Sequence, residues 1–411
     1  MSRALVQEPS ALLLMSMPNF KVVLLRWMQG KTLKRKITNP LREDGDTNVD
    51  NHLIKYEDII GQESDVRLLK VSKDGLRKLS VSVRHPSSEE FISLSPRRVA
   101  PIYATYASTI VSLLDIHVEP PSVENGPETT GGPSFQILEA GTGHGSLTLQ
   151  LSRAIAAANP PAGRDIKPIP SKRRTFKAGK ESDGDIDEPE TDALIAWRKQ
   201  RRAVVHTVDI DPLNREHADK LIRSYRSAIY WPHINFYAGN VKDWISERTE
   251  SSEQKPFLDI VLLDMPGVQE YISSVVGAIK DGGQLLVFVP QITQIATCVQ
   301  EIVTKDLGLK LEQVVELGDG ISNGRLWDVH MATVRNTRTS DHVRNGLNAQ
   351  QKPENEDSST DGEYREAAAP SVGTIPPMVC RPMVGELTRG GGFIGLWKRI
   401  PNSAPEQLGN P

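Results

Sequence analysis

A glycine-rich turn near the middle of the chain is the strongest chemical signal in the sequence. Residues 137–148 read Ile-Leu-Glu-Ala-Gly-Thr-Gly-His-Gly-Ser-Leu-Thr, an apolar run that ends in an acid and leads through Gly-x-Gly-x-Gly into a helix-like stretch. Glycine adopts positive φ angles and allows a ligand to approach the backbone closely. The first N–H groups of a helix have no partner inside the helix. The pattern therefore predicts a strand, turn and helix that bind a ligand through the backbone.

The spacing of these glycines separates two nucleotide cofactors. A dinucleotide site uses Gly-x-Gly-x-x-Gly to hold a pyrophosphate, whereas the third position of that motif is Ser146 here. Glu139 would repel a pyrophosphate but suits the cationic methionine end of S-adenosylmethionine. A dinucleotide site and a turn without ligand are the alternatives. We predict an S-adenosylmethionine site at Glu139, Gly141, Gly143, His144, Gly145, Ser146 and Leu147.

Two further strand ends add polar groups to this site. The run 205–209 ends in Asp209, whose carboxylate can accept hydrogen bonds from both ribose hydroxyls. Asp209 could instead cap the next helix, although Asp211 before Pro212 is the better candidate for that role. Asn240 and Val241 follow another strand, and we expect the Asn240 side chain to bond the adenine amino group. A simple turn asparagine is the alternative.

Asp264 is the candidate catalytic residue. The apolar run Ile260–Leu263 delivers this single carboxylate to the carboxyl end of a strand, where ligands bind in open α/β sheets. A carboxylate beside a methyl donor can orient an amino-bearing base and take up its proton. We therefore expect Asp264 to contact both cofactor and substrate, with a structural cap as the alternative.

The elements that carry these residues alternate between strand and helix. Short apolar runs at 135–138, 203–208, 234–238, 258–263 and 284–289 predict strands, and helical spacing falls at 104–114, 146–158, 212–229 and 268–279. This alternation predicts a doubly wound parallel α/β sheet. Together with the S-adenosylmethionine site predicted above, the expected fold is a Rossmann-like class I methyltransferase sheet. Short β-like runs at 67–71, 79–83 and 90–93 predict a small β-rich module ahead of it.

Composition divides the chain into three regions. Residues 1–45 are basic and acid-poor, which fits a mitochondrial presequence or a disordered start. Residues 50–96 form the β-rich module, and 97–400 the methyltransferase domain. Opposed charge blocks at 160–192 and a polar stretch at 336–377 predict disordered insertions.

The bulk properties exclude several classes of protein. A net charge of −3 argues against a protein that coats nucleic acid non-specifically. Its two cysteines do not make a disulfide framework or a metal site, and no other metal motif is present. The apolar stretches are shorter than the ~20 residues that span a bilayer, so no membrane association is expected.

With these motifs in order, the chain resembles the catalytic subunit of tRNA (adenine-N1)-methyltransferase, which makes 1-methyladenosine in the T-loop. The resemblance covers about residues 52–400 outside the two insertions. It rests on Glu139–Thr148 and on Leu263–Pro266, Leu-Asp-Met-Pro, which resembles the family's Leu-Asp-Leu-Pro with its catalytic Asp. Three shorter segments, at 289–294, 381–382 and 392–394, are also similar to the family. The glycine motif is intact, which points to the catalytic rather than the partner subunit.

The sequence departs from the family pattern at several positions that, by the resemblance, belong to the surface that binds adenine and tRNA. Val99 and Ala100 replace part of a Lys-Arg-Thr-Gln motif, Tyr106 stands at an Asp position, and Pro266 is not followed by the family's Trp. Asn240 replaces an acid, and Gly390-Gly391 replaces His-Thr. A non-catalytic RNA-binding scaffold or a methyltransferase for another substrate is therefore the alternative function.

The resemblance also implies partners. The family acts on tRNA and assembles as tetramers, so we expect a homo-oligomer or a complex with a non-catalytic tRNA-binding subunit. The basic start favours mitochondria, whereas Lys34-Arg35-Lys36 is the alternative, a weak nuclear signal.

Overall fold

The structure, a computed structural model, divides the chain into two units. One comprises residues 1–317 and 391–411, and the other comprises residues 318–390. The described residues are 22–29, 32–41, 44–60, 66–71, 78–120, 133–163, 166, 191–251, 256–318, 327–331, 378–382 and 391–401.

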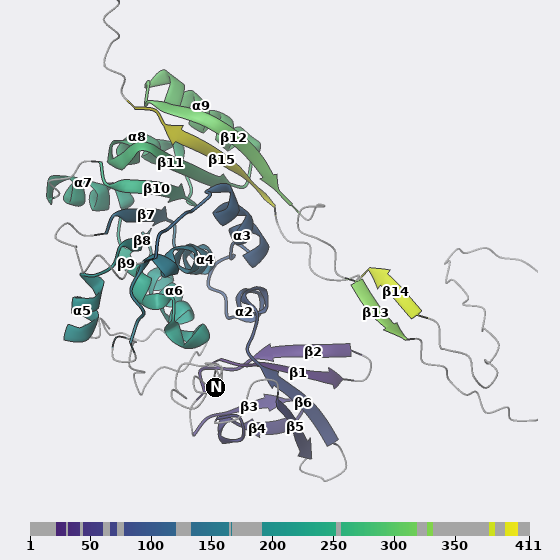
Figure 1. Cartoon of the computed structure of the whole chain (residues 1–411). Coiled ribbons are helices and arrows are strands. Elements are labelled where there is room, and N and C mark those ends of the chain that lie inside the picture. Colours follow the sequence, from purple (N-terminus) through teal and green to yellow (C-terminus); the bar gives the residue numbers. More distant parts are fainter. Residues whose placement is uncertain are drawn as a thin grey trace, which may run out of the picture. The chain divides into compact units, whose positions relative to one another are not determined.

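A seven-stranded sheet forms the centre of the first unit, in the order β12-β15-β11-β10-β7-β8-β9 (Figure 1). The five strands from β11 to β9 in this order pair in parallel. Strand β15 lies between β11 and β12 and pairs antiparallel with both. This confirms the predicted Rossmann-like sheet. The strands are β7 (Phe135–Ala140), β8 (Ala203–Asp209), β9 (Ile234–Ala238), β10 (Leu258–Leu263), β11 (Ile279–Val289), β12 (Leu309–Leu317) and β15 (Gly392–Arg399).

Helices cover both faces of this sheet. Successive strand residues point to opposite faces, so Ile137 joins one hydrophobic core and Leu138 the other. The first core receives apolar residues from α2 (Ser88–Leu94), α3 (Ala104–Leu113), α4 (Ser146–Ile155), α5 (Asp192–Arg198) and α6 (Pro212–Ser224). The second receives them from α7 (Val241–Ser251), α8 (Gln269–Val275) and α9 (Ile292–Thr304).

The N-terminal module is a four-stranded antiparallel sheet in the order β2-β1-β6-β5, with a separate hairpin β3-β4. A third hydrophobic core joins this sheet to the hairpin and to the short helix that follows it. The elements are β1 (Leu24–Gln29), β2 (Thr32–Ile37), β3 (Asp46–Val49), β4 (His52–Lys55), η2 (Tyr56–Asp58), β5 (Val66–Val71) and β6 (Lys78–Arg84).

The N-terminal boundary differs from the sequence-based expectation. Residues 1–45 were expected to lie outside the folded part, but β1 and β2 fall within them. Of the basic residues that suggested a presequence, Arg26, Lys34, Arg35 and Lys36 belong to these strands. The mitochondrial interpretation therefore rests on residues 1–21, which lie outside the described residues.

Two predictions of secondary structure were wrong. The run 90–93 was expected to be a strand, but it belongs to α2, because Ser87 and Glu90 form a reciprocal capping box that starts a helix. The helix predicted over 212–229 ends at Ser224. Tyr225 caps it in an extended conformation with a ψ of 126°, and the short turn η4 (Arg226–Ala228) follows.

The second unit consists, where it is described, of the antiparallel pair β13 (Trp327–Met331) and β14 (Met378–Pro382). The domain predicted over 97–400 is therefore interrupted by a separate unit. The predicted insertion 336–377 lies outside the described residues, as does most of 160–192. No described helix has the length and apolar character needed to cross a membrane.

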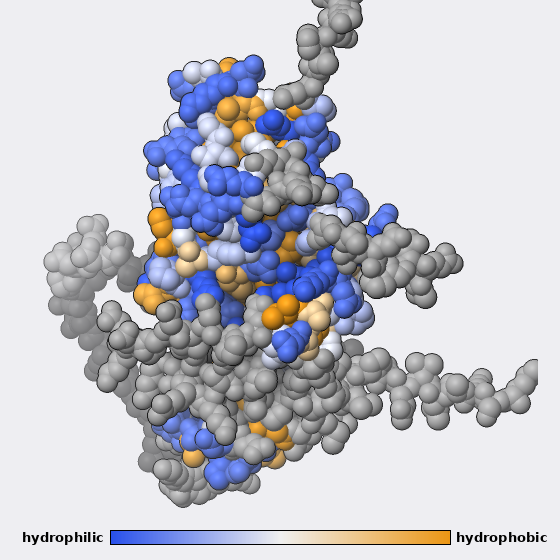
Figure 2. All heavy atoms as spheres, turned by 90° about the vertical axis from the view of Figure 1, so that its left-hand side faces the viewer, coloured by the Kyte–Doolittle hydropathy of each residue, from blue (hydrophilic) through white to orange (hydrophobic). Residues whose placement is uncertain are grey.

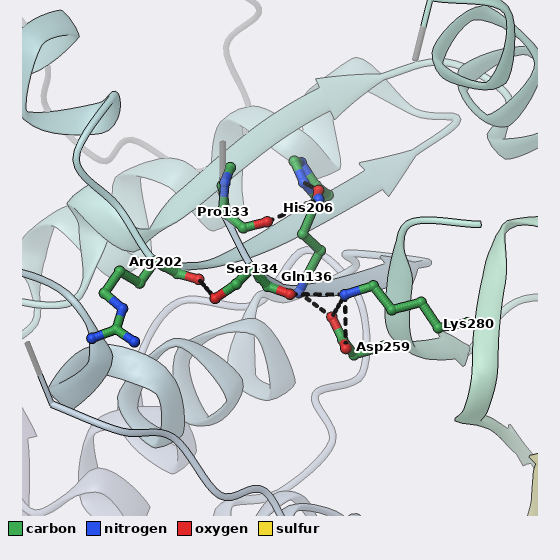
Figure 3. Close-up of polar contacts among 7 residues, drawn as sticks. All are labelled: Pro133, Ser134, Gln136, Arg202, His206, Asp259 and Lys280. Atoms are coloured by element: carbon green, nitrogen blue, oxygen red, sulfur yellow. Dashed lines mark hydrogen bonds and ion pairs between the residues drawn. The ribbon is translucent and has the colours of Figure 1, made fainter. Parts of the chain in front are cut away.

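A polar network fastens the sheet near the amino ends of its central strands (Figure 3). The Asp259 carboxylate accepts a 2.7 Å hydrogen bond from the Gln136 backbone N–H and pairs with Lys280 Nζ at 2.8 Å. Lys280 also donates to the Ser134 carbonyl at 2.8 Å. His206 Nε2 lies 3.1 Å from Gln136 Oε1, and burial holds its pKa well below the ordinary value. These contacts join β7, β8, β10 and β11, so His206 is structural.

We expect Asp259→Ala to lower the free energy of unfolding by about 1–3 kcal/mol, because the Gln136 N–H and Lys280 both lose a charged partner. The matched control is Asp281→Ala, which removes an exposed carboxylate on the same strand as Lys280. Denaturant unfolding measures both. Equal stability of the two variants would contradict the role of this network.

Candidate functional site

The glycines of the turn have positive φ angles, which other residues rarely adopt. Gly141 and Gly145 have φ angles of 94° and 83°. A Cβ on Gly141 would lie 1.9 Å from the Asp264 carbonyl oxygen, and one on Gly145 would lie 2.7 Å from Ala218 Cβ. Helix α4 then begins at Ser146 with no side-chain cap, so its first N–H groups face the carboxyl edge of the sheet.

Asp209 ends the neighbouring strand β8 and is tied to the turn. Its Oδ2 accepts a 2.8 Å hydrogen bond from the Gly143 N–H, and its Oδ1 accepts one of 2.9 Å from the Asp211 N–H. Asn214 Nδ2 lies 3.3 Å from the same Oδ1. Each carboxylate oxygen has two lone pairs, so Asp209 keeps capacity for a ribose. The Asp211 side chain accepts from Leu213 N and caps α6, as the sequence indicated.

Glu139 lies one residue before the end of β7 and is 1 % exposed. Its Oε2 accepts hydrogen bonds of 2.5 Å from Thr148 Oγ1 and 2.7 Å from Thr207 Oγ1. Thr142 Oγ1 lies 2.6 Å from Thr207 Oγ1 and extends this chain of hydroxyls. Burial raises the pKa of Glu139 to about 8, and the two hydroxyl contacts oppose the shift.

Asp264 follows β10 and lies beside the start of the glycine turn. Its backbone N–H donates to the Ala140 carbonyl at 2.9 Å. Protein atoms surround the carboxylate densely, although part of it stays open to solvent. Burial raises the pKa of Asp264 to about 7, and the negative charge of Asp209 adds to the shift. No described residue donates a hydrogen bond to this carboxylate, so it is ready to accept one from a ligand.

The other predicted residues lie at this edge, but several have inward-facing side chains. His144, Ser146, Leu147 and Val241 are at most 4 % exposed, so a ligand would meet their backbones. The His144 ring packs against His217 with centroids 5.4 Å apart, and burial lowers its pKa to about 4. It is therefore a neutral packing residue at physiological pH.

The Asn240 side chain already makes one structural hydrogen bond. Its Oδ1 accepts a 2.9 Å hydrogen bond from the Lys242 N–H at the start of α7, which favours the turn alternative noted above. One lone pair of this oxygen is left for a ligand. Asn240 therefore lies at the site, but its side chain is not reserved for binding a ligand.

The structure adds two residues that sequence reasoning missed. Ile210, directly after Asp209, is 73 % exposed and offers an apolar side chain beside the carboxylate. Arg98 donates to Asp211 Oδ2 at 2.9 Å and to Asn214 Oδ1 at 3.0 Å, which ties residues 95–103 to α6. Arg98 and Asp211 are 113 positions apart, so no local pattern could reveal this pair.

The structure describes three of the positions that break the family pattern. Tyr106 is 2 % exposed and belongs to the first core. Val99 lies beside the turn, where its Cγ2 would be 3.4 Å from a Cβ on Gly143. Gly267 has a φ of 67° and turns the chain after Pro266, and Val268 then enters the second core.

The site as a whole is suited to a cation that also carries hydroxyl groups. Glu139, Asp209 and Asp264 lie at the carboxyl ends of three adjacent strands. Besides burial, the charges of Asp264 and Asp209 raise the pKa of Glu139, and the charge of Asp209 raises that of Asp264. A positive ligand would relieve this repulsion. Within the described ranges, no group of three or more His, Cys, Asp or Glu residues is arranged to hold a metal ion.

Comparisons with known proteins find distant relatives. No protein-family model matches the chain. It is 22% identical over 251 residues to a tRNA (adenine(58)-N(1))-methyltransferase, TrmI, from Thermus thermophilus, which covers 61% of the chain and 69% of that protein. A second strain has a relative with the same identity and coverage.

Solved structures give the fold. The chain is similar to a SAM-dependent O-methyltransferase from Thermotoga maritima, with a TM-score of 0.52, 11% identity, and coverage of 95% of this chain and 96% of the other. A tRNA (m1A58) methyltransferase TrmI from Aquifex aeolicus matches with a TM-score of 0.47 and 14% identity over 93% of this chain and 98% of the other. By its similarity to the Thermotoga structure, the sheet has the fold of class I methyltransferases, and a β module precedes it.

The buried acid predicts how stability depends on pH. Unfolded Glu139 ionises near 4.5, whereas the folded group ionises near 8, so the folded state holds an extra proton between these values. Its contribution to stability is full below pH 4.5 and is lost as the pH rises through 8. Glu139→Gln should therefore gain stability relative to the wild type as the pH rises across this window.

Denaturant unfolding at a series of pH values measures this difference. Glu270→Gln, which changes an exposed glutamate, is the control and should run parallel to the wild type. A Glu139→Gln difference that does not change with pH would show that Glu139 ionises normally in the folded protein.

Proposed function

We propose that this protein is an S-adenosylmethionine-dependent methyltransferase that methylates adenine N1 in the T-loop of tRNA. The observation that carries the proposal is the pairing of a glycine turn with Asp264, whose carboxylate has no donor among the described residues. The Thermus relative, named as a tRNA (adenine(58)-N(1))-methyltransferase, supports the choice of tRNA and adenine.

The residues at the carboxyl edge fit the proposed cofactor. The space beside Gly141 and Gly145 is too narrow for a side chain, and the uncapped start of α4 offers N–H donors. Asp209 can accept a hydrogen bond from a ribose hydroxyl, and Ile210 offers an apolar contact to a flat ring. An ammonium group beside Glu139 would favour the ionised form of this carboxyl. When bound, S-adenosylmethionine supplies a methyl carbon made electrophilic by its sulfonium.

Asp264 is then the residue that positions the base. Adenine N1 attacks with its lone pair: the N1–C bond forms while the C–S bond breaks, and the bond electrons stay on sulfur. Asp264 accepts a hydrogen bond from the neighbouring exocyclic amino group, which directs the N1 lone pair towards the methyl carbon. Its charge also stabilises the positive charge that develops on the ring.

The quaternary state belongs to the same proposal. By the resemblance described above, the chain assembles as a tetramer, either with itself or with a non-catalytic tRNA-binding subunit. Sedimentation of the purified chain alone separates these two assemblies, because only the first forms without a second subunit.

Asp264→Ala should abolish 1-methyladenosine formation, with a rate loss of about 10²–10³-fold from removal of one oriented charge. The assay is purified protein with labelled S-adenosylmethionine and total tRNA, followed by nucleoside analysis. Asp243→Ala, which removes an exposed acid on α7, is the control and should keep the wild-type rate.

Two outcomes of this assay would change the proposal. A wild-type rate for Asp264→Ala would remove Asp264 from the reaction. If the wild type methylates no RNA yet binds S-adenosylmethionine, the non-catalytic scaffold or a methyltransferase for another substrate becomes the better assignment.

Asp209→Ala should weaken the binding of S-adenosylmethionine about 10- to 100-fold. The variant loses charge-assisted hydrogen bonds to the ribose and also frees the Gly143 N–H. Calorimetry measures the affinity, again with Asp243→Ala as the control. An unchanged affinity, with the melting temperature preserved, would exclude Asp209 from the cofactor site.

A further inference from the structure

The carboxylate of Asp209 is held by donors from the glycine turn and from the start of α6. Its Oδ2 accepts a hydrogen bond from the Gly143 N–H at 2.8 Å, and its Oδ1 accepts one from the Asp211 N–H at 2.9 Å. The Asn214 side chain also donates to Oδ1, from Nδ2 at 3.3 Å. The orientation of the Asp209 carboxylate therefore depends on what holds Asp211 and Asn214 in place.

Arg98 contacts both of these residues from a distant part of the chain. Its Nη2 donates to Asp211 Oδ2 at 2.9 Å, and its Nε donates to Asn214 Oδ1 at 3.0 Å. The two bonds come from one planar guanidinium, whose donors have a fixed geometry. The other oxygen of Asp211 accepts from the Leu213 N–H and caps α6. One side chain thus fixes the two α6 residues that hold Oδ1 of Asp209.

The bond to Arg98 also determines which way the Asn214 amide points. An asparagine side chain has an oxygen that accepts and a nitrogen that donates, whereas a guanidinium only donates. Arg98 therefore keeps the oxygen of Asn214 on its own side and turns the nitrogen towards Asp209. Without Arg98, the 3.3 Å contact to Asp209 would be left to hold this direction, and that distance is long for a hydrogen bond.

The face of α6 that bears Asn214 packs against the glycine turn independently of Arg98. Asn214, His217 and Ala218 follow the i, i+3, i+4 spacing of one helix face. The His217 ring packs against the ring of His144, and a Cβ on Gly145 would lie 2.7 Å from Ala218 Cβ. The loss of a side-chain contact at the start of α6 therefore acts on local orientation rather than on the position of the helix.

The contribution of Arg98 to folding is small. The side chains of Arg98 and Asp211 are 41% and 36% exposed. Ion pairs as exposed as this one add little to stability, because water screens them. Removal of the guanidinium should therefore leave the fold intact and show its effect at the cofactor site.

We propose that Arg98 is a positioning residue for the cofactor. Through Asn214 and Asp211 it holds the carboxylate of Asp209 in the orientation that accepts a hydrogen bond from a ribose hydroxyl. The proposal rests on the proposed function, which assigns the ribose of S-adenosylmethionine to Asp209. Arg98 acts through these residues and not by contact with the ligand.

The test varies the residue and the ligand together. Calorimetry with the full chain measures the affinity for S-adenosylhomocysteine and for its 2′,3′-dideoxy analogue, which lacks both ribose hydroxyls. Arg98→Gln should bind S-adenosylhomocysteine on the order of 10-fold more weakly than the wild type, the effect of about one hydrogen bond to a charged group. It should bind the dideoxy analogue as tightly as the wild type does, because that ligand makes no bond that depends on Asp209.

Three further variants show how the effect is transmitted. Arg98→Lys keeps a positive charge beside Asp211 but lacks the planar fork, so its affinity for S-adenosylhomocysteine should lie between those of the wild type and Arg98→Gln. Asn214→Ala should show the same ligand-selective loss, and the two losses should be less than multiplicative when Arg98→Gln is added.

Lys220→Gln is the matched control, because it breaks an ion pair of similar exposure, with Glu216, on the same helix. It should bind both ligands like the wild type. Melting temperatures establish that all variants fold.

The outcomes separate this proposal from the proposed function. Equal affinities of the wild type and Arg98→Gln for S-adenosylhomocysteine would overturn the proposal, even if the wild type methylates tRNA. An equal loss of affinity for both ligands would also overturn it, because Arg98 would then act on the general structure of the site. A loss confined to the ligand with ribose hydroxyls would support it, even if no RNA is methylated. A wild type that binds neither ligand would overturn both this proposal and the proposed cofactor site.

Discussion

The close packing of Gly141 against Asp264 is the constraint on which the rest of the site depends. A single added carbon on Gly141 would lie 1.9 Å from the Asp264 carbonyl oxygen, and the Asp264 N–H bonds to the Ala140 carbonyl. This contact joins the ends of β7 and β10. It sets the course of the glycine turn, so that the Gly143 N–H meets Asp209 and α4 starts at the same edge. Only glycine permits this approach.

The carboxylates at the two ends of the central sheet have different surroundings. Near the amino ends, Asp259 is neutralised by Lys280 and by a backbone N–H, and the result is a stable joint between strands. At the carboxyl ends, burial, together with the charge of Asp209, raises the pKa of Glu139 to about 8 and that of Asp264 to about 7. A fold tolerates such repulsion only at a cost, and perturbed carboxylates of this kind are typical of functional sites. The contrast locates the function at the carboxyl edge.

The N-terminal module, by contrast, pairs basic strand residues with acids on both faces of its sheet. Lys70 pairs with Asp58 on the covered face, and Arg84 pairs with Glu90 on the opposite face. Figure 2 shows one face of the molecule on which hydrophilic side chains dominate the described surface and hydrophobic ones form small separate groups. The crowded carboxylates at the carboxyl edge of the central sheet are therefore the more informative feature.

The amino-acid sequence by itself determined the type of fold and the composition of the site. The alternation of strands and helices, the Gly-x-Gly-x-Gly turn and the acids after β8 and β10 are local patterns, and β9 and β10 have the predicted bounds. The tertiary structure decided what depends on contacts between distant segments. Arg98 meets Asp211 across 113 positions, and Asp259 meets the Gln136 N–H across 123 positions. The burial that raises the pKa of Glu139 and the capping role of Asn240 also depend on neighbours. A local pattern reports which residues occur near one another in the chain, whereas charge repulsion and hydrogen-bond saturation depend on which groups meet in space.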